Sequence, residues 1–235
     1  MRQIFVPLVP LVAPLLLLWA AVPPMAAAAP TQPVVLELFT SQGCSSCPPA
    51  DIAVAKVADR PGVIALSFNV TYWDHLGWKD TFARPEFTDR QVAYAKALGQ
   101  GSPYTPEVVA GGRAGGVGNT PRAVDDLIAR GRTTATTFVS ATPGKVSVGR
   151  GVAPRRGADV WLVSYDPRVI QVPVKAGENT GKTLPQRNVV RGLKRLGSWT
   201  GQAASFMAPT VDPSLRAVVI VQGKDAGPIL AVATL

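Results

Sequence analysis

One stretch decides the fold that we predict: Val34-Val35-Leu36-Glu37-Leu38-Phe39-Thr40-Ser41-Gln42-Gly43-Cys44-Ser45-Ser46-Cys47-Pro48-Pro49. Residues 34–39 are large or β-branched apolar residues interrupted by one glutamate, which predicts a buried strand. The two prolines suit the first turn of a helix, where backbone N–H groups have no partner, and we expect this helix to end near Arg60. A second apolar run at residues 63–68 predicts another buried strand. Strand, helix and strand together indicate a βαβ unit with parallel strands.

The chain has two cysteines, Cys44 and Cys47, and they lie at the start of the predicted helix. A bridge over so short a loop removes little chain entropy, so stabilisation of the fold explains the pair poorly. A helix N-terminus stabilises a thiolate through unpaired N–H groups and the helix dipole. We therefore predict a catalytic dithiol–disulfide site, in which Cys44 is a partly exposed nucleophile and Cys47 is the more buried resolving thiol.

Two other interpretations of the cysteine pair stay open, a structural disulfide and a metal site. Zinc needs two further good ligands, and the chain offers one histidine and no third cysteine. Copper(I) bound by two thiolates is compatible with the sequence. In this alternative the protein is a non-catalytic binding module whose cysteines are structural or hold copper. For the redox interpretation we assign no metal ligands and no cofactor.

The rest of the chain is organised in three parts. A polar and aromatic loop at residues 69–83 precedes a predicted helix at 85–98, a strand at 107–110, a hairpin partner at 113–117 and a helix at 121–129. Residues 132–144 are rich in Thr and Ser and are interpreted as a linker. Beyond them, strand patterns separated by turns predict a mainly antiparallel β region, with residues 189–196 ambiguous between strand and helix. The predicted domains are therefore an α/β domain at residues 30–131 and a β-rich C-terminal domain at residues 145–235.

The order of these elements resembles the thioredoxin superfamily. Tyr104-Thr105-Pro106 matches the loop of that superfamily that contains a cis-proline and faces the cysteines. The resemblance implies a thioredoxin-like fold for residues 30–131 and a cis bond between Thr105 and Pro106, which is inexpensive only before proline. It also implies that the Thr105 backbone pairs with a bound substrate strand.

A closer resemblance is to a bacterial family of exported thioredoxin-like proteins of unknown function. The matching pieces span nearly the whole mature chain and comprise residues 39–51, 72–78, 104–106, 177–179 and 188–191. This family supplies no substrate. Pro48 after the second cysteine and the long loop at 69–83 depart from thioredoxin itself, and both departures weaken any transfer of reductase activity.

The aromatic residues near the predicted site have two interpretations. Trp73 and Trp78 either line a substrate groove or cap the core beneath the long loop. Together with Tyr104, Thr105 and Pro106 they form our predicted substrate-binding set.

Two titratable residues are candidates for acid–base chemistry. His75 lies between the two tryptophans, where it either assists proton transfer near the sulfurs or orders the aromatic loop. Glu37 interrupts the first strand, where it either accepts a proton behind Cys47 or faces solvent. We keep both residues as possible acid–base groups.

The N-terminus predicts a secretory signal peptide at residues 1–28. A positive charge at Arg2 precedes an almost wholly apolar run at 4–22 and a cluster of small residues at 25–29. The alternative is a retained membrane anchor, against which three prolines within the apolar run argue. We expect cleavage and a periplasmic or secreted protein with no integral membrane span.

The charge of the chain is positive but scattered. The formal net charge of +9 includes Arg2 and becomes +8 without it. No basic stripe is interleaved with aromatic residues, so we expect no nucleic-acid partner. The predicted partner is a protein or a small thiol or disulfide.

Overall fold

The structure is a computed structural model that describes residues 1, 3–4 and 32–235. The signal peptide predicted for residues 1–28 therefore lies outside the described residues. Three helices are present in the described part, α1 (Pro48–Ala55), α2 (Pro85–Ala97) and α3 (Pro121–Gly131), with a short 3-10 turn η1 (Asp74–Leu76). The strands are β1 (Val34–Thr40), β2 (Val63–Asn69), β3 (Glu107–Ala110), β4 (Ala114–Gly116), β5 (Val139–Thr142), β6 (Lys145–Val148), β7 (Ala158–Pro173), β8 (Thr183–Trp199), β9 (Ala204–Met207), β10 (Arg216–Gly223) and β11 (Ile229–Thr234).

The strands form one large sheet and one small sheet. The large sheet has eight strands in the order β11-β10-β7-β8-β2-β1-β3-β4, and the small one has the order β5-β6-β9. Strand β1 pairs with β2 in parallel, and β2 meets β8 in parallel at a single register pair, Ser67 with Val189. Every other pairing is antiparallel. The chain is thus mixed α/β, with a mostly antiparallel sheet and few helices, in agreement with the α/β and antiparallel β content that we predicted.

Local sequence explains where the helices begin. Prolines occupy the first turn of all three, where the missing N–H has no consequence. At α3 the Thr120 hydroxyl accepts a hydrogen bond from the Ala123 N–H at 3.2 Å, which is an N-cap. Helix α1 ends at Ala55, before the predicted end near Arg60, because the following residues continue as turns up to β2.

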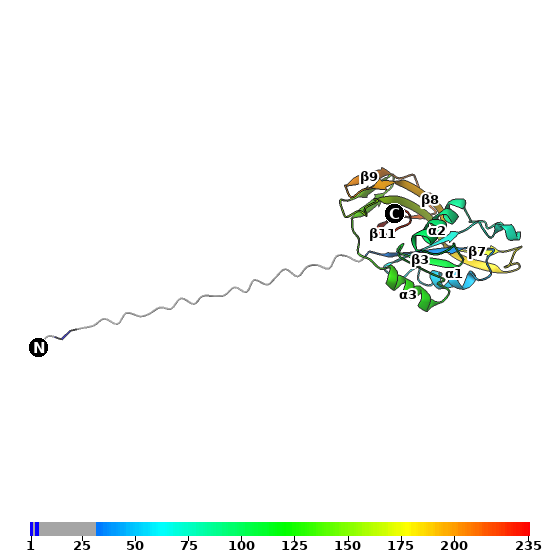
Figure 1. Ribbon diagram of the computed structural model, residues 1–235, viewed down its shortest axis with the longest axis horizontal. Coiled ribbons are helices and arrows are strands. Elements are labelled where there is room, and N and C mark those ends of the chain that lie inside the picture. Colours follow the sequence, from blue (N-terminus) through cyan, green and yellow to red (C-terminus); the bar gives the residue numbers. More distant parts are fainter. Residues whose placement is uncertain (2, 5–31) are drawn as a thin grey trace.

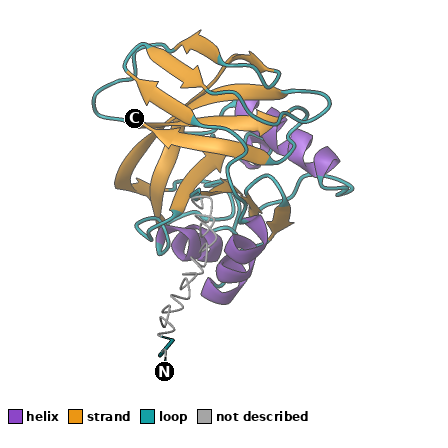
Figure 2. Ribbon diagram, turned by 90° about the vertical axis from the view of Figure 1, so that its left-hand side faces the viewer, coloured by secondary structure: helices purple, strands orange, loops and turns teal. Residues whose placement is uncertain are grey.

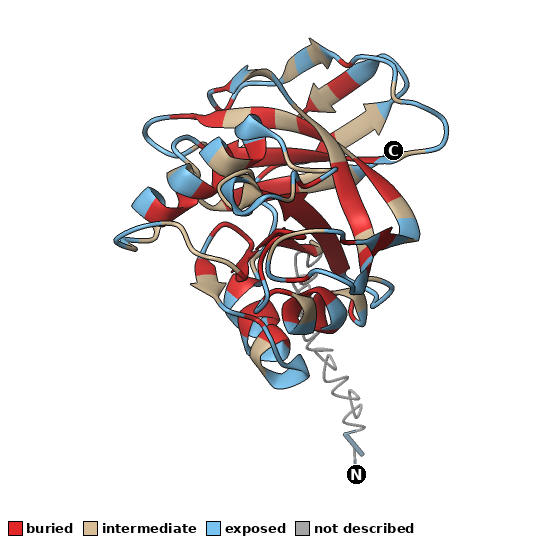
Figure 3. Cartoon of the chain, turned by 90° about the vertical axis from the view of Figure 1, so that its right-hand side faces the viewer, coloured by how far each residue is buried: buried red, intermediate tan, exposed pale blue. Residues whose placement is uncertain are grey.

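Two layers cover the opposite faces of the β1–β2–β3 part of the sheet. Helices α1 and α3 pack on one face, and α2 packs on the other, as Figures 1 and 2 show. Phe39 of β1, Phe68 of β2 and Phe87 of α2 form an aromatic centre between this helix and the sheet, and all three are fully buried. Burial is concentrated in the strands, whereas the outer faces of the helices are exposed (Figure 3).

The small sheet packs on the C-terminal part of the large sheet. Val146 and Val148 of β6 share a core with Val160, Trp199 and other buried residues of β7, β8, β10 and β11. Two packed antiparallel layers are the arrangement of a β-sandwich.

The structure joins the two predicted domains through one sheet. Asn188 donates its side-chain N–H to the Ala65 carbonyl at 2.8 Å, and the Ser67 hydroxyl donates to the Arg187 carbonyl at 2.9 Å. Asn188 has a positive φ of 52°, a conformation that asparagine tolerates better than most residues. Part of the segment predicted as a linker forms β5, and the ambiguous segment at 189–196 belongs to β8. No helix within residues 32–235 is long and apolar enough to cross a membrane.

Candidate functional site

The cysteines lie where β1 ends and α1 begins. Cys44 and Cys47 form a disulfide, and Cys47 is the residue that precedes the first turn of α1. The Cys47 N–H donates to the Cys44 carbonyl at 3.2 Å, which closes the turn between them. The hydroxyl of Ser46, an exposed residue, lies 3.4 Å from Cys44 Sγ, in hydrogen-bonding contact with the sulfur. Cys44 is therefore the cysteine whose sulfur has an exposed polar neighbour.

One expectation about the cysteines is wrong. Cys44 was predicted to be partly exposed, but Cys44 and Cys47 are both 0% exposed. The reason is a cover supplied by a distant part of the chain, the turn at residues 174–182 between β7 and β8. We call this segment the hairpin tip.

The hairpin tip is hydrogen-bonded directly to the cysteine loop. Asn179, which is fully buried, donates its side-chain N–H groups to the carbonyls of Gln42 at 3.0 Å and Cys44 at 2.9 Å. The neighbouring Glu178 carboxylate accepts the Ser45 N–H at 3.0 Å. Hydrogen bonding from the Ser45 side chain, and then from this N–H, lowers the pKa of Glu178. The motif at residues 177–179 thus covers the backbone of the cysteine loop on both sides of Cys44.

A buried carboxyl group lies one helical turn after Cys47. The Asp51 N–H donates to the Cys47 carbonyl at 3.1 Å, and the Thr40 hydroxyl donates to Asp51 Oδ2 at 3.1 Å. Helical side chains lean toward the N-terminus, so the Asp51 carboxyl is directed over the turn that holds Cys47. Burial raises the pKa of Asp51 to about 8, although the Thr40 hydrogen bond lowers it in part. Asp51 is therefore mainly protonated at neutral pH.

A second acidic residue, Asp80, supports the cysteine loop from the long aromatic loop. Its Oδ2 accepts the Gln42 N–H at 2.7 Å and the Asn69 side-chain N–H at 2.8 Å. Burial raises the pKa of Asp80, and these hydrogen bonds lower it in part. Trp78, one of the predicted substrate-binding residues, donates its indole N–H to Gln42 Oε1 at 2.9 Å. Trp78 therefore holds the cysteine loop through a polar contact as well as packing against the β7–β8 hairpin.

Trp73 connects the cysteine loop to the proline loop. Its indole N–H donates to the Thr105 hydroxyl at 2.7 Å. Trp73 also packs closely against Gly43, since a Cβ atom added at Gly43 would lie only 3.1 Å from the Trp73 Cβ. The bond between Thr105 and Pro106 is cis, which confirms that expectation.

The proline loop is held from behind by α2. The Gln91 side chain donates to the Tyr104 carbonyl at 2.6 Å and to the carboxylate of Glu107, a fully buried residue, at 2.8 Å. Burial raises the pKa of Glu107, and Gln91 lowers it in part. Tyr104 has a raised pKa, first from burial and then from Glu107.

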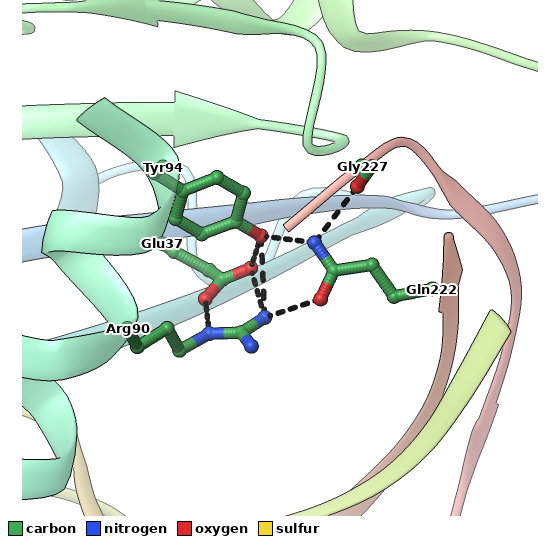
Figure 4. A network of polar contacts seen from close by, with 5 residues as sticks. All are labelled: Glu37, Arg90, Tyr94, Gln222 and Gly227. Atoms are coloured by element: carbon green, nitrogen blue, oxygen red, sulfur yellow. Dashed lines mark hydrogen bonds and ion pairs between the residues drawn. The ribbon is translucent and has the colours of Figure 1, made fainter. Parts of the chain in front are cut away.

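Glu37 neither faces solvent nor lies against the cysteine loop, the two placements that we considered for it. It does not face solvent, since it is 0% exposed, and its carboxylate is bound by α2 and not by the cysteine loop. Arg90 donates through Nε and Nη2 to the two Glu37 oxygens, and the Tyr94 hydroxyl donates to Glu37 Oε1 at 2.6 Å. Gln222 of β10 accepts from Arg90 Nη2 at 3.1 Å and donates to Tyr94 and to the Gly227 carbonyl, as Figure 4 shows. The residue is the anion of a buried ion pair.

His75 is exposed, and its Nδ1 lies 2.8 Å from the carbonyl of Tyr72 in its own loop. This contact agrees with the loop-ordering interpretation of His75. Among residues 32–235, no group of three or more His, Cys, Asp or Glu side chains is arranged to hold a metal ion.

Sequence reasoning missed two residues of this site. Asp51 was recognised only as the last letter of a motif, although an acid four positions after a helix-capping cysteine lies on the same helix face. Asn179 belonged to a motif without an assigned role, and no local signal indicates that a side chain 135 positions away covers Cys44.

Comparison with known proteins identifies relatives of this chain. A model of the family described as "Protein of unknown function (DUF1223)" matches residues 35–222. A solved structural-genomics target from Agrobacterium tumefaciens is 31% identical, with a TM-score of 0.72 over 88% of this chain and 96% of that one. HBP35 of Porphyromonas gingivalis is 15% identical, with a TM-score of 0.55 over 87% of this chain and 75% of that one, a likeness of fold alone. No curated protein matches the sequence. The chain belongs to the DUF1223 family of proteins of unknown function.

Proposed function

We propose that this chain is an exported thiol–disulfide exchange protein, periplasmic or secreted, built on a thioredoxin-like fold. The fold proposal is supported by the parallel β1-α1-β2 unit, the antiparallel β3–β4 hairpin followed by α3, and the cis bond before Pro106. The observation that carries the functional proposal is the Cys44–Cys47 disulfide at the start of α1, with a buried, mainly protonated Asp51 one turn later. The partner is a protein or small-molecule thiol or disulfide.

The exchange begins when the hairpin tip leaves the disulfide. A partner thiolate attacks Cys44 Sγ, a bond forms between the partner sulfur and Cys44, and the Cys44–Cys47 bond breaks. Cys47 leaves as a thiolate carrying the electron pair. A second partner thiolate then attacks the mixed disulfide, so the partner becomes a disulfide and Cys44 is released as a thiolate. Two electrons pass from the partner to the cysteine pair, and the reverse sequence reduces a partner disulfide.

Asp51 supplies the proton that the leaving sulfur needs. Its pKa of about 8 keeps the carboxyl protonated at neutral pH, and its place one turn after Cys47 puts it near the developing thiolate. Transfer of that proton to Cys47 stabilises the leaving group. In the reverse direction the Asp51 carboxylate accepts the Cys47 proton.

A trapping experiment tests the exchange. In a Cys47→Ala variant of the full chain, expressed with its N-terminal segment, Cys44 can still attack a partner disulfide but no internal thiol releases the product. This variant is expected to accumulate mixed disulfides that dissolve in reductant, whereas Cys44→Ala is expected to form almost none. The asymmetry is expected because Cys44 Sγ contacts the exposed Ser46 and Cys47 begins the helix.

Equal trapping by the two variants would show that attacker and resolver are wrongly assigned. Absence of trapped partners for both variants would contradict the exchange proposal itself.

A second candidate function is a non-catalytic module in which the disulfide is structural. Complete burial of both cysteines favours it, because a covered bridge is protected from thiols. This candidate predicts that both alanine variants lose stability alike and that neither captures specific partners.

A further inference from the structure

A cavity remote from the disulfide lies between α2 and the C-terminal strands. It measures about 440 Å³ and is walled by residues of α2, β7, β8, β10 and the β10–β11 turn. None of these residues contacts the cysteine loop or the hairpin tip in the hydrogen bonds described above. A volume of this size is in the range of small-molecule sites.

The floor of the cavity holds one free donor. The Arg90 side chain is only 4% exposed, and its Nε and Nη2 atoms bond to Glu37, Tyr94 and Gln222. Its Nη1 atom makes no hydrogen bond to any residue of the described part of the chain and points away from the network in Figure 4. This nitrogen is not one of the fully buried polar atoms that lack a partner in the described part of the chain, so it is accessible from the cavity and free to donate. A ligand oxygen in the cavity would satisfy it.

The walls of the cavity are apolar. The Arg90 guanidinium lies 5.6 Å from the ring centre of Trp161, and Ala93, Leu193 and Ala226 line the space around it. These side chains suit a short aliphatic group rather than a large polar one.

The rim of the cavity carries carboxylates, although the chain as a whole has a net charge of +9. Asp159 pairs with Arg195 at 2.8 Å and Asp225 pairs with Arg156 at 2.5 Å, so both have cations already. Within residues 32–235, Asp89 has no ion-pair partner, and Glu86 has only Arg84 at 3.9 Å. Glu86 and Asp89 are the carboxylates that remain available to an added cation.

The spacing of Glu86 and Arg90 limits how far apart the charged groups of a ligand can be. Glu86 lies four positions before Arg90 on α2, about 6 Å along the helix axis. An amine and an oxygen separated by one or two carbon atoms span such a gap when each makes one hydrogen bond of about 2.9 Å. We propose that this cavity binds a small aliphatic amino acid, with its carboxylate on Arg90 Nη1, its ammonium group on Glu86 and Asp89, and its side chain against Trp161.

The test is an NMR titration of the intact protein that follows the Trp161 indole N–H, assigned with Trp161→Phe. L-leucine carries all three recognised groups, 4-methylpentanoate lacks the amine, and 3-methylbutylamine lacks the carboxylate. We expect saturable shifts with leucine at about 1 mM, and binding at least about tenfold weaker for each analogue, because the charge-assisted contacts of one end of the ligand are lost.

Variants of the exposed rim assign the ammonium site without disturbing the core. The double variant Glu86→Gln with Asp89→Asn should weaken leucine about tenfold and leave 4-methylpentanoate unchanged. Asp126→Asn, an exposed carboxylate on α3, is the matched control and should change neither. Absence of saturable shifts with leucine, or equal affinity for leucine and both analogues, would overturn the proposal. The outcome is independent of whether the disulfide is catalytic.

Discussion

At the scale of single residues, burial of Asp51 makes stability depend on pH. Its pKa is about 8 in the folded protein against 3.8 for an ordinary aspartate, with burial as the main cause. Between these values the folded state holds a proton that the unfolded state has lost. The contribution of Asp51 to the free energy of unfolding is therefore fully present below pH 4. It is lost as pH rises toward 8, by an amount on the order of several kcal/mol.

The variant Asp51→Asn removes this titration. We expect its free energy of unfolding to equal that of the parent near pH 4 and to exceed it by at least about 1 kcal/mol at pH 8. Urea unfolding at pH 4, 6 and 8 measures the difference, with the exposed Asp126→Asn as control. Parallel curves for parent and Asp51→Asn would show that Asp51 ionises normally.

At the scale of elements, the β7–β8 hairpin controls access to the disulfide. Asn179→Ala deletes the hydrogen bonds to the carbonyls of Gln42 and Cys44. Each is worth about 1 kcal/mol, so opening of the hairpin tip should become about tenfold or more easier. Reduction of the disulfide by dithiothreitol should accelerate by the same factor. Asn119→Ala, which removes an exposed asparagine before α3, should reduce at the parent rate.

An unchanged reduction rate in Asn179→Ala would mean that the hairpin tip does not limit access. This measurement needs no partner protein, so it separates the covering role of the tip from the proposed exchange activity.

Local sequence predicts the order of the elements but not the contacts between elements that are distant in sequence. The β1-α1-β2 order and the cis bond before Pro106 were predictable, because apolar runs, helix-start prolines and a loop motif are all local signals. The burial of Cys44 was not, because its cover lies 135 positions away. Glu37 was misinterpreted for the same reason, since its partner Arg90 follows 53 positions later on another element.

At the scale of the whole molecule, the Glu37–Arg90 pair joins β1, α2 and β10. Arg90→Met leaves a buried carboxylate without its cation, which typically costs about 3–5 kcal/mol. Because the network bonds both parts of the large sheet, we expect the loss to appear as one cooperative unfolding transition at lower denaturant. Thermal and urea unfolding followed by two probes measure it, with Arg122→Met on the exposed side of α3 as control. Two separate transitions in the parent protein would show that the parts unfold independently.

The distance in sequence between Cys44 and its cover has a consequence in time. A ribosome that adds about 5–20 residues per second needs on the order of ten seconds to reach Asn179 after Cys44. During that interval the cysteine loop lacks the hydrogen bonds that Asn179 donates to Gln42 and Cys44 in the finished chain. An oxidant that acts before the hairpin tip is synthesised can reach the cysteines directly. An oxidant that acts on the folded protein requires the hairpin tip to open first. The cysteine pair is therefore synthesised well before the segment that covers it.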